Sequence, residues 1–127
     1  MDWHDRGMAR TVLIVDDHAG FRAQARALLV AAGYEVVGEA GDGTSALGAA
    51  RELKPQVVLL DVQLPDTTGF DVAHSLRAGP DPPLIVLVST RASSDYGRLI
   101  DRSGARGFVS KSELSAGALS LILDGLS

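Results

Sequence analysis

The chain contains no cysteine. This absence excludes disulfides, thiolate metal sites and thiol nucleophiles, so any metal would be held by oxygen or nitrogen ligands. Long apolar runs are also missing, because stretches such as residues 11–15 and 57–60 fall far short of the ~20 residues of a membrane-spanning helix. The polar opening, residues 1–7, has no secretory signal pattern. From these absences we expect a cytoplasmic protein that does not enter a membrane.

An excess of positive charge is missing as well. The sequence has 12 Lys and Arg against 16 Asp and Glu, a formal net charge of −4. We therefore expect no direct binding of nucleic acid by this chain. Its 127 residues, 46% hydrophobic and 22% charged, are typical of one ordinary folded domain. We interpret residues 1–10 as a flexible leader and residues 11–127 as that domain.

Short apolar runs alternate with longer stretches whose apolar residues recur every three and four positions. The runs, interpreted as strands, are residues 11–15, 34–37, 57–60, 84–88 and 107–109. The helical faces are Phe21, Ala25, Leu28, Leu29 and Ala32; Ala46, Leu47, Ala50 and Leu53; and Phe70, Ala73 and Leu76. A weaker helix is expected at 94–103 and a last one at 115–126. This alternation predicts an α/β fold, a doubly wound five-stranded parallel sheet with five helices in flavodoxin-like topology.

Acidic residues follow two of the predicted strands. Asp16 and Asp17 come directly after the first strand, and Asp61 comes directly after the third. The carboxyl ends of parallel strands meet at one sheet edge, so the three carboxylates should converge there. Their mutual repulsion favours a neutralising cation with oxygen ligands, Mg²⁺ or alternatively Mn²⁺. The competing interpretation is that these residues only cap helices.

Two other polar residues end the remaining strands at the same edge. Ser89 follows the fourth strand and Lys111 follows the fifth. With a metal, they would surround Asp61 as a stabilising shell for phosphoryl transfer, and Asp61 would be the nucleophile. Taken alone, Ser89 is a common turn residue and Lys111 a common surface residue. His18 starts a predicted helix, which favours a capping or surface role over metal ligation.

Four motifs together carry a family resemblance. They are Val-Leu-Ile-Val-Asp16-Asp17-His18, Val-Val-Leu-Leu-Asp61-Val-Gln63-Leu-Pro65 with Gly69, Leu-Val-Ser89-Thr90, and Gly104-Ala-Arg-Gly107-Phe108-Val-Ser-Lys111. From about residue 11 to its end, the chain resembles the receiver domains of response regulators in two-component systems. The resemblance implies that Asp61 is the phosphoacceptor in a phosphorelay.

The resemblance also implies a role for each residue around Asp61. Asp17, Asp61 and the Gln63 backbone carbonyl would bind the metal directly, and Asp16 would help through water. Ser89 and Lys111 would each contact a phosphoryl oxygen, completing a catalytic set with Asp61. Ser89 and Phe108 would form the switch, although Phe108 is equally well explained as core packing, because Phe lacks a hydroxyl group.

The implied activity is regulatory. A sensor histidine kinase or phosphotransfer protein would donate the phosphoryl group, and the chain would catalyse only its own phosphorylation and dephosphorylation, so we do not class it as an enzyme. Helix 94–103, strand 107–109 and helix 115–126 would form the output face, for a homodimer or another partner. The last helix is more apolar than one buried stripe requires, which favours a partner surface over unusually deep burial.

Two departures from the family pattern are visible. The stretch from Asp16 to Arg22 is similar to the subgroup that usually carries a helix-turn-helix output domain, yet no such domain follows here. We expect either a single-domain regulator or a receiver from a longer protein. Ser112 stands where many receivers have Pro after the lysine, so the usual cis bond lacks its cause and a different loop is expected.

Two functions of other classes compete. One is a phosphatase or phosphotransferase that acts on small molecules through an aspartyl nucleophile, but no segment is left to form the cap that encloses such substrates. The other is an interaction module on the same fold that works without phosphorylation. The acidic trio together with Ser89 and Lys111 argues against it.

Overall fold

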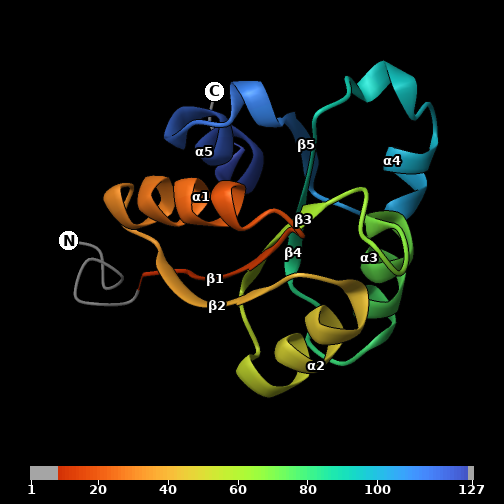
Figure 1. Ribbon diagram of the computed structural model, residues 1–127, viewed down its shortest axis with the longest axis horizontal. Helices are drawn as coiled ribbons and strands as arrows, with labels where there is room; N and C mark the ends of the chain where they lie inside the picture. Colours follow the sequence, from red (N-terminus) through yellow and green to blue (C-terminus); the bar gives the residue numbers. More distant parts are fainter. Residues whose placement is uncertain (1–8, 126–127) are drawn as a thin grey trace.

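The structure is a computed structural model that describes residues 9–125, so most of the expected leader lies outside the described residues. Strands and helices alternate along the chain (Figure 1). The strands are β1 (Thr11–Val15), β2 (Glu35–Ala40), β3 (Val57–Asp61), β4 (Leu84–Ser89) and β5 (Gly107–Ser110). The helices are α1 (Ala19–Ala31), α2 (Gly43–Leu53), α3 (Gly69–Ala78), α4 (Leu99–Ser103) and α5 (Ala116–Asp124).

The five strands form one parallel sheet in the order β2-β1-β3-β4-β5. Helices α1 and α5 cover one face, and α2, α3 and α4 cover the other (Figure 1). The chain moves outward from β1 to β2 and then returns to place β3 on the other side of β1, so the order reverses between β1 and β3. The predicted doubly wound fold is confirmed, and ligands of such folds bind at the carboxyl ends of strands beside this reversal.

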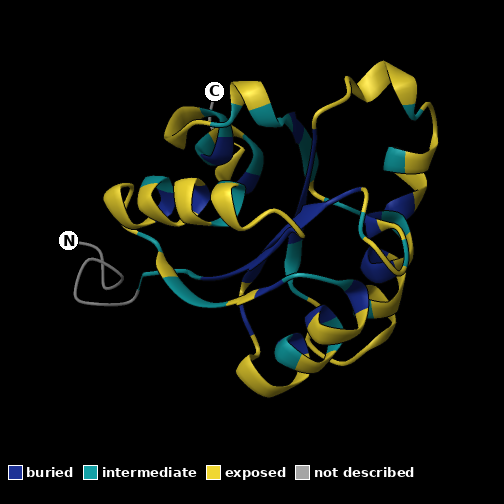
Figure 2. Cartoon of the chain, in the orientation of Figure 1, coloured by how far each residue is buried: buried dark blue, intermediate teal, exposed yellow. Residues whose placement is uncertain are grey.

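The core lies in two layers, one on each face of the sheet. Successive strand residues point to opposite faces, so Leu13 packs toward α2 and α3 while Ile14 packs toward α1 and α5. The central strand β3 is buried along its whole length, as Figure 2 shows for the middle of the sheet. A strand covered on both faces needs apolar residues at nearly every position, which explains the unbroken run that precedes Asp61.

Strand β2 is longer than the predicted 34–37 and begins one residue later. It is an edge strand, and its register with β1 shifts between Val12, which pairs with Val36, and Leu13, which pairs with Gly38. Val37 is therefore the extra residue of a β-bulge. Such bulges bend and twist an edge strand, which disfavours pairing with another chain.

The helix expected at 94–103 is interrupted, and this prediction was wrong in part. A single 3₁₀ turn spans Ser93–Asp95, and α4 begins only at Leu99. Gly97 between them has a φ of +57°, a left-handed conformation that breaks the helical path. The segment that leads away from Ser89 is therefore a turn followed by a short helix.

The loop after β5 also differs from the common receiver pattern, as expected. A 3₁₀ turn, Lys111–Glu113, follows the strand, and the described residues contain no cis peptide bond.

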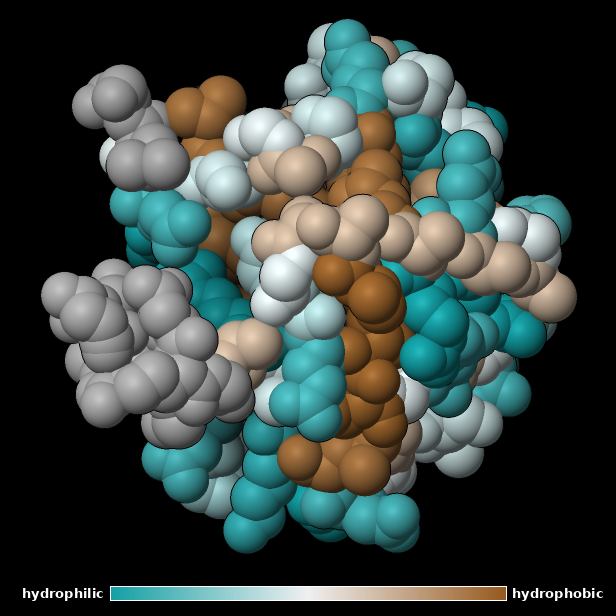
Figure 3. Space-filling model, turned by 90° about the vertical axis from the view of Figure 1, so that its left-hand side faces the viewer, coloured by the Kyte–Doolittle hydropathy of each residue, from teal (hydrophilic) through white to brown (hydrophobic). Residues whose placement is uncertain are grey.

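Within residues 9–125, no helix has the length and apolarity needed to cross a membrane. The face shown in Figure 3 carries a band of apolar side chains bordered by hydrophilic ones.

Candidate functional site

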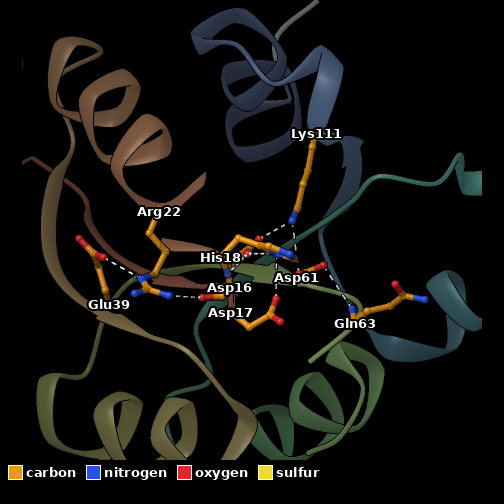
Figure 4. Close-up of polar contacts among 8 residues, drawn as sticks. All are labelled: Asp16, Asp17, His18, Arg22, Glu39, Asp61, Gln63 and Lys111. Atoms are coloured by element: carbon orange, nitrogen blue, oxygen red, sulfur yellow. Dashed lines mark hydrogen bonds and ion pairs between the residues drawn. The ribbon is translucent and has the colours of Figure 1, made fainter. Parts of the chain in front are cut away.

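The three predicted carboxylates meet at the carboxyl edge of the sheet (Figure 4). Asp16 and Asp17 follow β1, and Asp61 is the last residue of β3, the strand beside it. One ligand atom from each, together with one from His18, lie within 4.8 Å of one another. Asp16 and Asp61 are buried whereas Asp17 is exposed, so the pocket is open to solvent on the Asp17 side.

Lys111 reaches into this pocket from the end of β5. Its ammonium lies 2.6 Å from Asp16 Oδ2 and 3.4 Å from Asp61 Oδ2. The contact with Asp16 is an ion pair, so the buried Asp16 Oδ2 has a charged partner. Above the ammonium, the Phe21 ring centroid is 4.5 Å away, a cation–π contact that fixes the lysine from the α1 side. The predicted edge position of Lys111 is therefore correct.

Burial and neighbouring charges shift the pKa values of Asp61 and Lys111. Desolvation, reinforced by the neighbouring charge of Asp16, raises the pKa of Asp61 to about 6, although Lys111 and the Gln63 amide oppose the rise. Burial alone would lower the pKa of Lys111, but its pairing with Asp16 and Asp61 outweighs this effect and raises it. Desolvation and the charge of Asp16 together thus outweigh the effect of Lys111 on Asp61, and a bound cation would stabilise the ionised carboxylates.

The donor set suits Mg²⁺ or Mn²⁺. Carboxylate oxygens dominate it, and these are the ligands that both ions prefer. The Gln63 backbone N–H donates to Asp61 Oδ1 at 3.2 Å, which orients that carboxylate, and the Gln63 side chain points away from the pocket (Figure 4). The residues present therefore fit the expected metal.

The backbone around Asp61 leaves no room for a side chain at position 69. The Gly69 amide donates to the Val62 carbonyl at 2.6 Å, and a Cβ on Gly69 would collide with the Asp61 carbonyl oxygen and the Val62 backbone. This close approach closes the loop between Asp61 and α3. It gives a physical reason for glycine at that place in the second motif.

Arg22 is a supporting residue that the sequence did not reveal. Its Nη1 donates to the Asp16 backbone carbonyl at 2.6 Å, and its Nε donates to Glu39 on the edge strand β2 at 3.0 Å. Arg26 holds the other oxygen of Glu39 at 2.7 Å. The chain turn that presents Asp16 and Asp17 is thus tied to both α1 and β2. The sequence offered only a weak signal for this role of Arg22, because arginines are common on protein surfaces.

His18 lies beside the carboxylates, but its side chain does not cap α1 as one expectation held. Its Nδ1 lies 3.0 Å from Asp17 Oδ1 and 3.3 Å from Asp16 Oδ1. Its backbone N–H donates to Asp16 Oδ1 at 2.8 Å, which turns the chain into the helix. The imidazole is mostly exposed at the rim of the pocket.

Ser89 ends β4 and is 1% exposed. Its Oγ lies 2.6 Å from the Tyr96 hydroxyl and accepts a hydrogen bond from the Arg91 amide at 3.1 Å. Within residues 9–125, Ser89 forms no hydrogen bond to Asp61. The Tyr96 ring lies between Phe70 and Phe108, with centroids 5.4 and 5.9 Å away. Phe108, the expected switch residue, is half-buried in this aromatic group.

A known protein family matches most of this chain. The family model described as "Response regulator receiver domain" matches residues 12–122. The chain belongs to this family. It is thus the receiver domain of a response regulator in a two-component system, and the resemblance stated from its motifs is confirmed.

The curated relatives include a DNA-binding transcriptional activator and a response regulator. The chain is 37% identical over 101 residues to the DNA-binding transcriptional activator EvgA of Escherichia coli, an alignment that covers 80% of this chain and 50% of EvgA. It is 44% identical over 102 residues to the nitrate/nitrite response regulator protein NarP of the same species, covering 79% and 47%. The chain thus spans about half the length of the curated relatives it matches.

Solved structures of response regulators superpose closely on this chain. The signal receiver domain of a NarL response regulator from Mycobacterium tuberculosis superposes with a TM-score of 0.81 at 32% identity, covering 92% of this chain and 95% of that one. A two-component response regulator of the LuxR family from Aurantimonas sp. gives 0.83 at 30% identity, covering 92% and 86%. These neighbours agree with the subgroup indicated by the Asp16 to Arg22 motif.

Proposed function

We propose that Asp61 accepts a phosphoryl group from a histidine kinase or phosphotransfer protein in a Mg²⁺-dependent reaction. The observation that carries the proposal is the pocket itself, in which Asp61 is buried beside Asp16 and paired with Lys111 at 3.4 Å. Above its pKa of about 6, Asp61 is a carboxylate and hence a nucleophile.

The chemistry needs no other nucleophile. An Asp61 carboxylate oxygen attacks the phosphorus of a phosphohistidine, an O–P bond forms on Asp61, and the N–P bond breaks with its electron pair left on the imidazole nitrogen. Lys111 offsets the charge that spreads over the phosphoryl oxygens, and Ser89 donates its hydroxyl hydrogen to one of them. Mg²⁺ or Mn²⁺ held by Asp17, Asp61 and the Gln63 carbonyl, with Asp16 helping through water, would supply further positive charge.

The phosphorylated domain would act on its output through the face made by α4, β5 and α5. A groove of about 380 Å³ lies there, lined partly by Phe108, Leu121 and Ile122. On α5, Leu121 is 58% exposed while Leu119 and Leu123 are buried, so the helix presents apolar surface on both sides. That distribution supports a homodimer or an output partner on this face. Ser89 and Phe108 link it to the pocket as the proposed switch.

The test is incubation with Mg²⁺ and acetyl phosphate followed by intact-mass measurement. We expect one phosphoryl adduct that is stable in acid and labile in alkali, absent from Asp61→Asn and abolished by a chelator. Asp95→Asn, a change at an exposed carboxylate outside the pocket, is the matched control and should be labelled like the parent. Turnover of small phosphoesters without an adduct would instead support a small-molecule phosphotransferase, and no reaction would support a phosphorylation-independent module.

A further inference from the structure

The Ser89 hydroxyl group already has two partners before any phosphoryl group is present. The Arg91 backbone N–H donates to Ser89 Oγ at 3.1 Å, and the Tyr96 hydroxyl lies 2.6 Å from the same atom. A serine hydroxyl has one hydrogen to donate and two lone pairs that accept. Which of the two hydroxyl groups donates therefore decides what Ser89 can still offer.

Acidity assigns the donor. A phenolic hydroxyl group is a stronger acid, and hence a stronger hydrogen-bond donor, than an aliphatic one, so the favoured arrangement is Tyr96 O–H donating to Ser89 Oγ. Arg91 N–H fills the second lone pair. Both acceptor positions of Ser89 are then used, and its own hydrogen is left over. Since Ser89 is 1% exposed, little solvent is available to take that hydrogen.

We propose that Tyr96 is a positioning residue for the phosphoryl group, acting through Ser89. This inference rests on the proposed function of Asp61. With Tyr96 and Arg91 occupying its lone pairs, Ser89 can bind a phosphoryl oxygen only by donating, which is the role that an anionic acceptor requires. The two hydroxyl groups then form a chain, from Tyr96 to Ser89 to the phosphoryl oxygen, in which each hydrogen bond polarises the next.

The same side chain connects Ser89 to the output face. The Tyr96 ring packs edge-on against Phe70 of α3 and tilted against Phe108 of β5. Tyr96 also follows the 3₁₀ turn Ser93–Asp95 and precedes the left-handed Gly97, so it lies at the break that separates Ser89 from α4. A change in the position of Ser89 would therefore act first on Tyr96, whose hydroxyl group contacts Ser89 and whose ring packs against Phe108.

Removal of one oxygen atom separates this role from packing. Tyr96→Phe keeps the ring between Phe70 and Phe108 and deletes only the hydroxyl group. Tyr34→Phe is the matched control, because Tyr34 is the other tyrosine of the chain and makes no contact with Ser89. Adduct formation from acetyl phosphate and Mg²⁺ should slow by about 2- to 13-fold in Tyr96→Phe, the range that one hydrogen bond covers, and should be unchanged in Tyr34→Phe.

A double-mutant cycle with Ser89→Ala assigns the effect to the hydroxyl chain. In the Ser89→Ala background, Tyr96→Phe should slow adduct formation no further, because the group it positions is gone. Hydrogen exchange of residues 93–103, measured without a phosphodonor, should be faster in Tyr96→Phe than in the parent, since the tie to Ser89 is lost.

Three outcomes would overturn the inference. Tyr96→Phe could form the adduct at the parent's rate, or faster, in which case Tyr96 is neutral or restrains Ser89. Its effect could persist in full in the Ser89→Ala background, which would assign it to packing. Alternatively, the parent could form no adduct at all, and then the proposed function fails as well. The first two results leave the parent labelled, so they separate failure of the Tyr96 role from failure of the Asp61 role.

Discussion

Asp61→Asn should stabilise the protein when no divalent cation is present. The Asp61 carboxyl group has a pKa of about 6 in the fold, raised by desolvation and by Asp16, against an ordinary value of 3.8. A pKa difference of that size corresponds to about 3 kcal/mol at pH 7, by which the ionised carboxylate destabilises the folded state. Asparagine keeps the shape and removes the charge, and Lys111 retains its ion pair with Asp16.

The sign of the pH dependence follows from the raised pKa. Well below pH 4, Asp61 is protonated in both the folded and the unfolded state and does not affect stability, so the parent and the variant should have similar stability there. As the pH rises from about 4 to about 6, the unfolded state loses the proton first, and the parent loses stability relative to Asp61→Asn. Above that window the gap should stay constant.

Thermal or urea denaturation in chelator at several pH values measures this gap. At pH 7 we expect the variant to melt about 10 °C above the parent, and Asp95→Asn to melt with the parent. Mg²⁺ should raise the melting temperature of the parent and narrow the gap, because the ion binds only the folded state. A variant no more stable than the parent at pH 7, or a gap that widens toward pH 4, would refute the reasoning.

Two further changes test the supports of the pocket, and a third tests the output face. Gly69→Ala should destabilise the fold by about 1–3 kcal/mol in urea denaturation, since its methyl group would press on the Asp61 carbonyl; wild-type stability would contradict the close packing. Arg22→Ala should weaken Mg²⁺ binding about 10-fold by calorimetry, whereas Arg26→Ala, which leaves the bond to Asp16 intact, should weaken it less. Leu121→Ser should change stability by less than about 0.5 kcal/mol in thermal melts, because that side chain is 58% exposed, and should weaken any self-association measured by sedimentation.

The fold was predictable because its strands carry an unambiguous pattern. Residues 57–60 form a run with no polar break, which only a strand covered on both faces requires. Boundaries were less accurate where local chemistry and edge effects decide them. Strand β2 continues past the bulge at Val37 and pairs with β1 as far as Ala40, and the left-handed Gly97 interrupts the helix expected at 94–103, although apolar spacing continues across it.

The site was predictable as far as strand ends determine it. Asp16 and Lys111 each follow a strand directly and Asp61 is the last residue of one, so topology alone brings them together. Supports that come from side-chain reach were not predictable in this way. Arg22 binds a backbone oxygen, and Tyr96 meets Ser89 only because the chain turns back between them. A hydroxyl-bearing aromatic a few residues after the strand-end serine was the one visible signal.

The most direct measurement locates the phosphoryl group itself. After reaction with acetyl phosphate and Mg²⁺, borohydride reduction converts an aspartyl phosphate to homoserine, and peptide mass spectrometry then identifies the residue. The account predicts homoserine at position 61 alone, and none when the chelator is present. Homoserine at position 16 or 17, or an unmodified residue 61 in protein that carries the adduct, would contradict it.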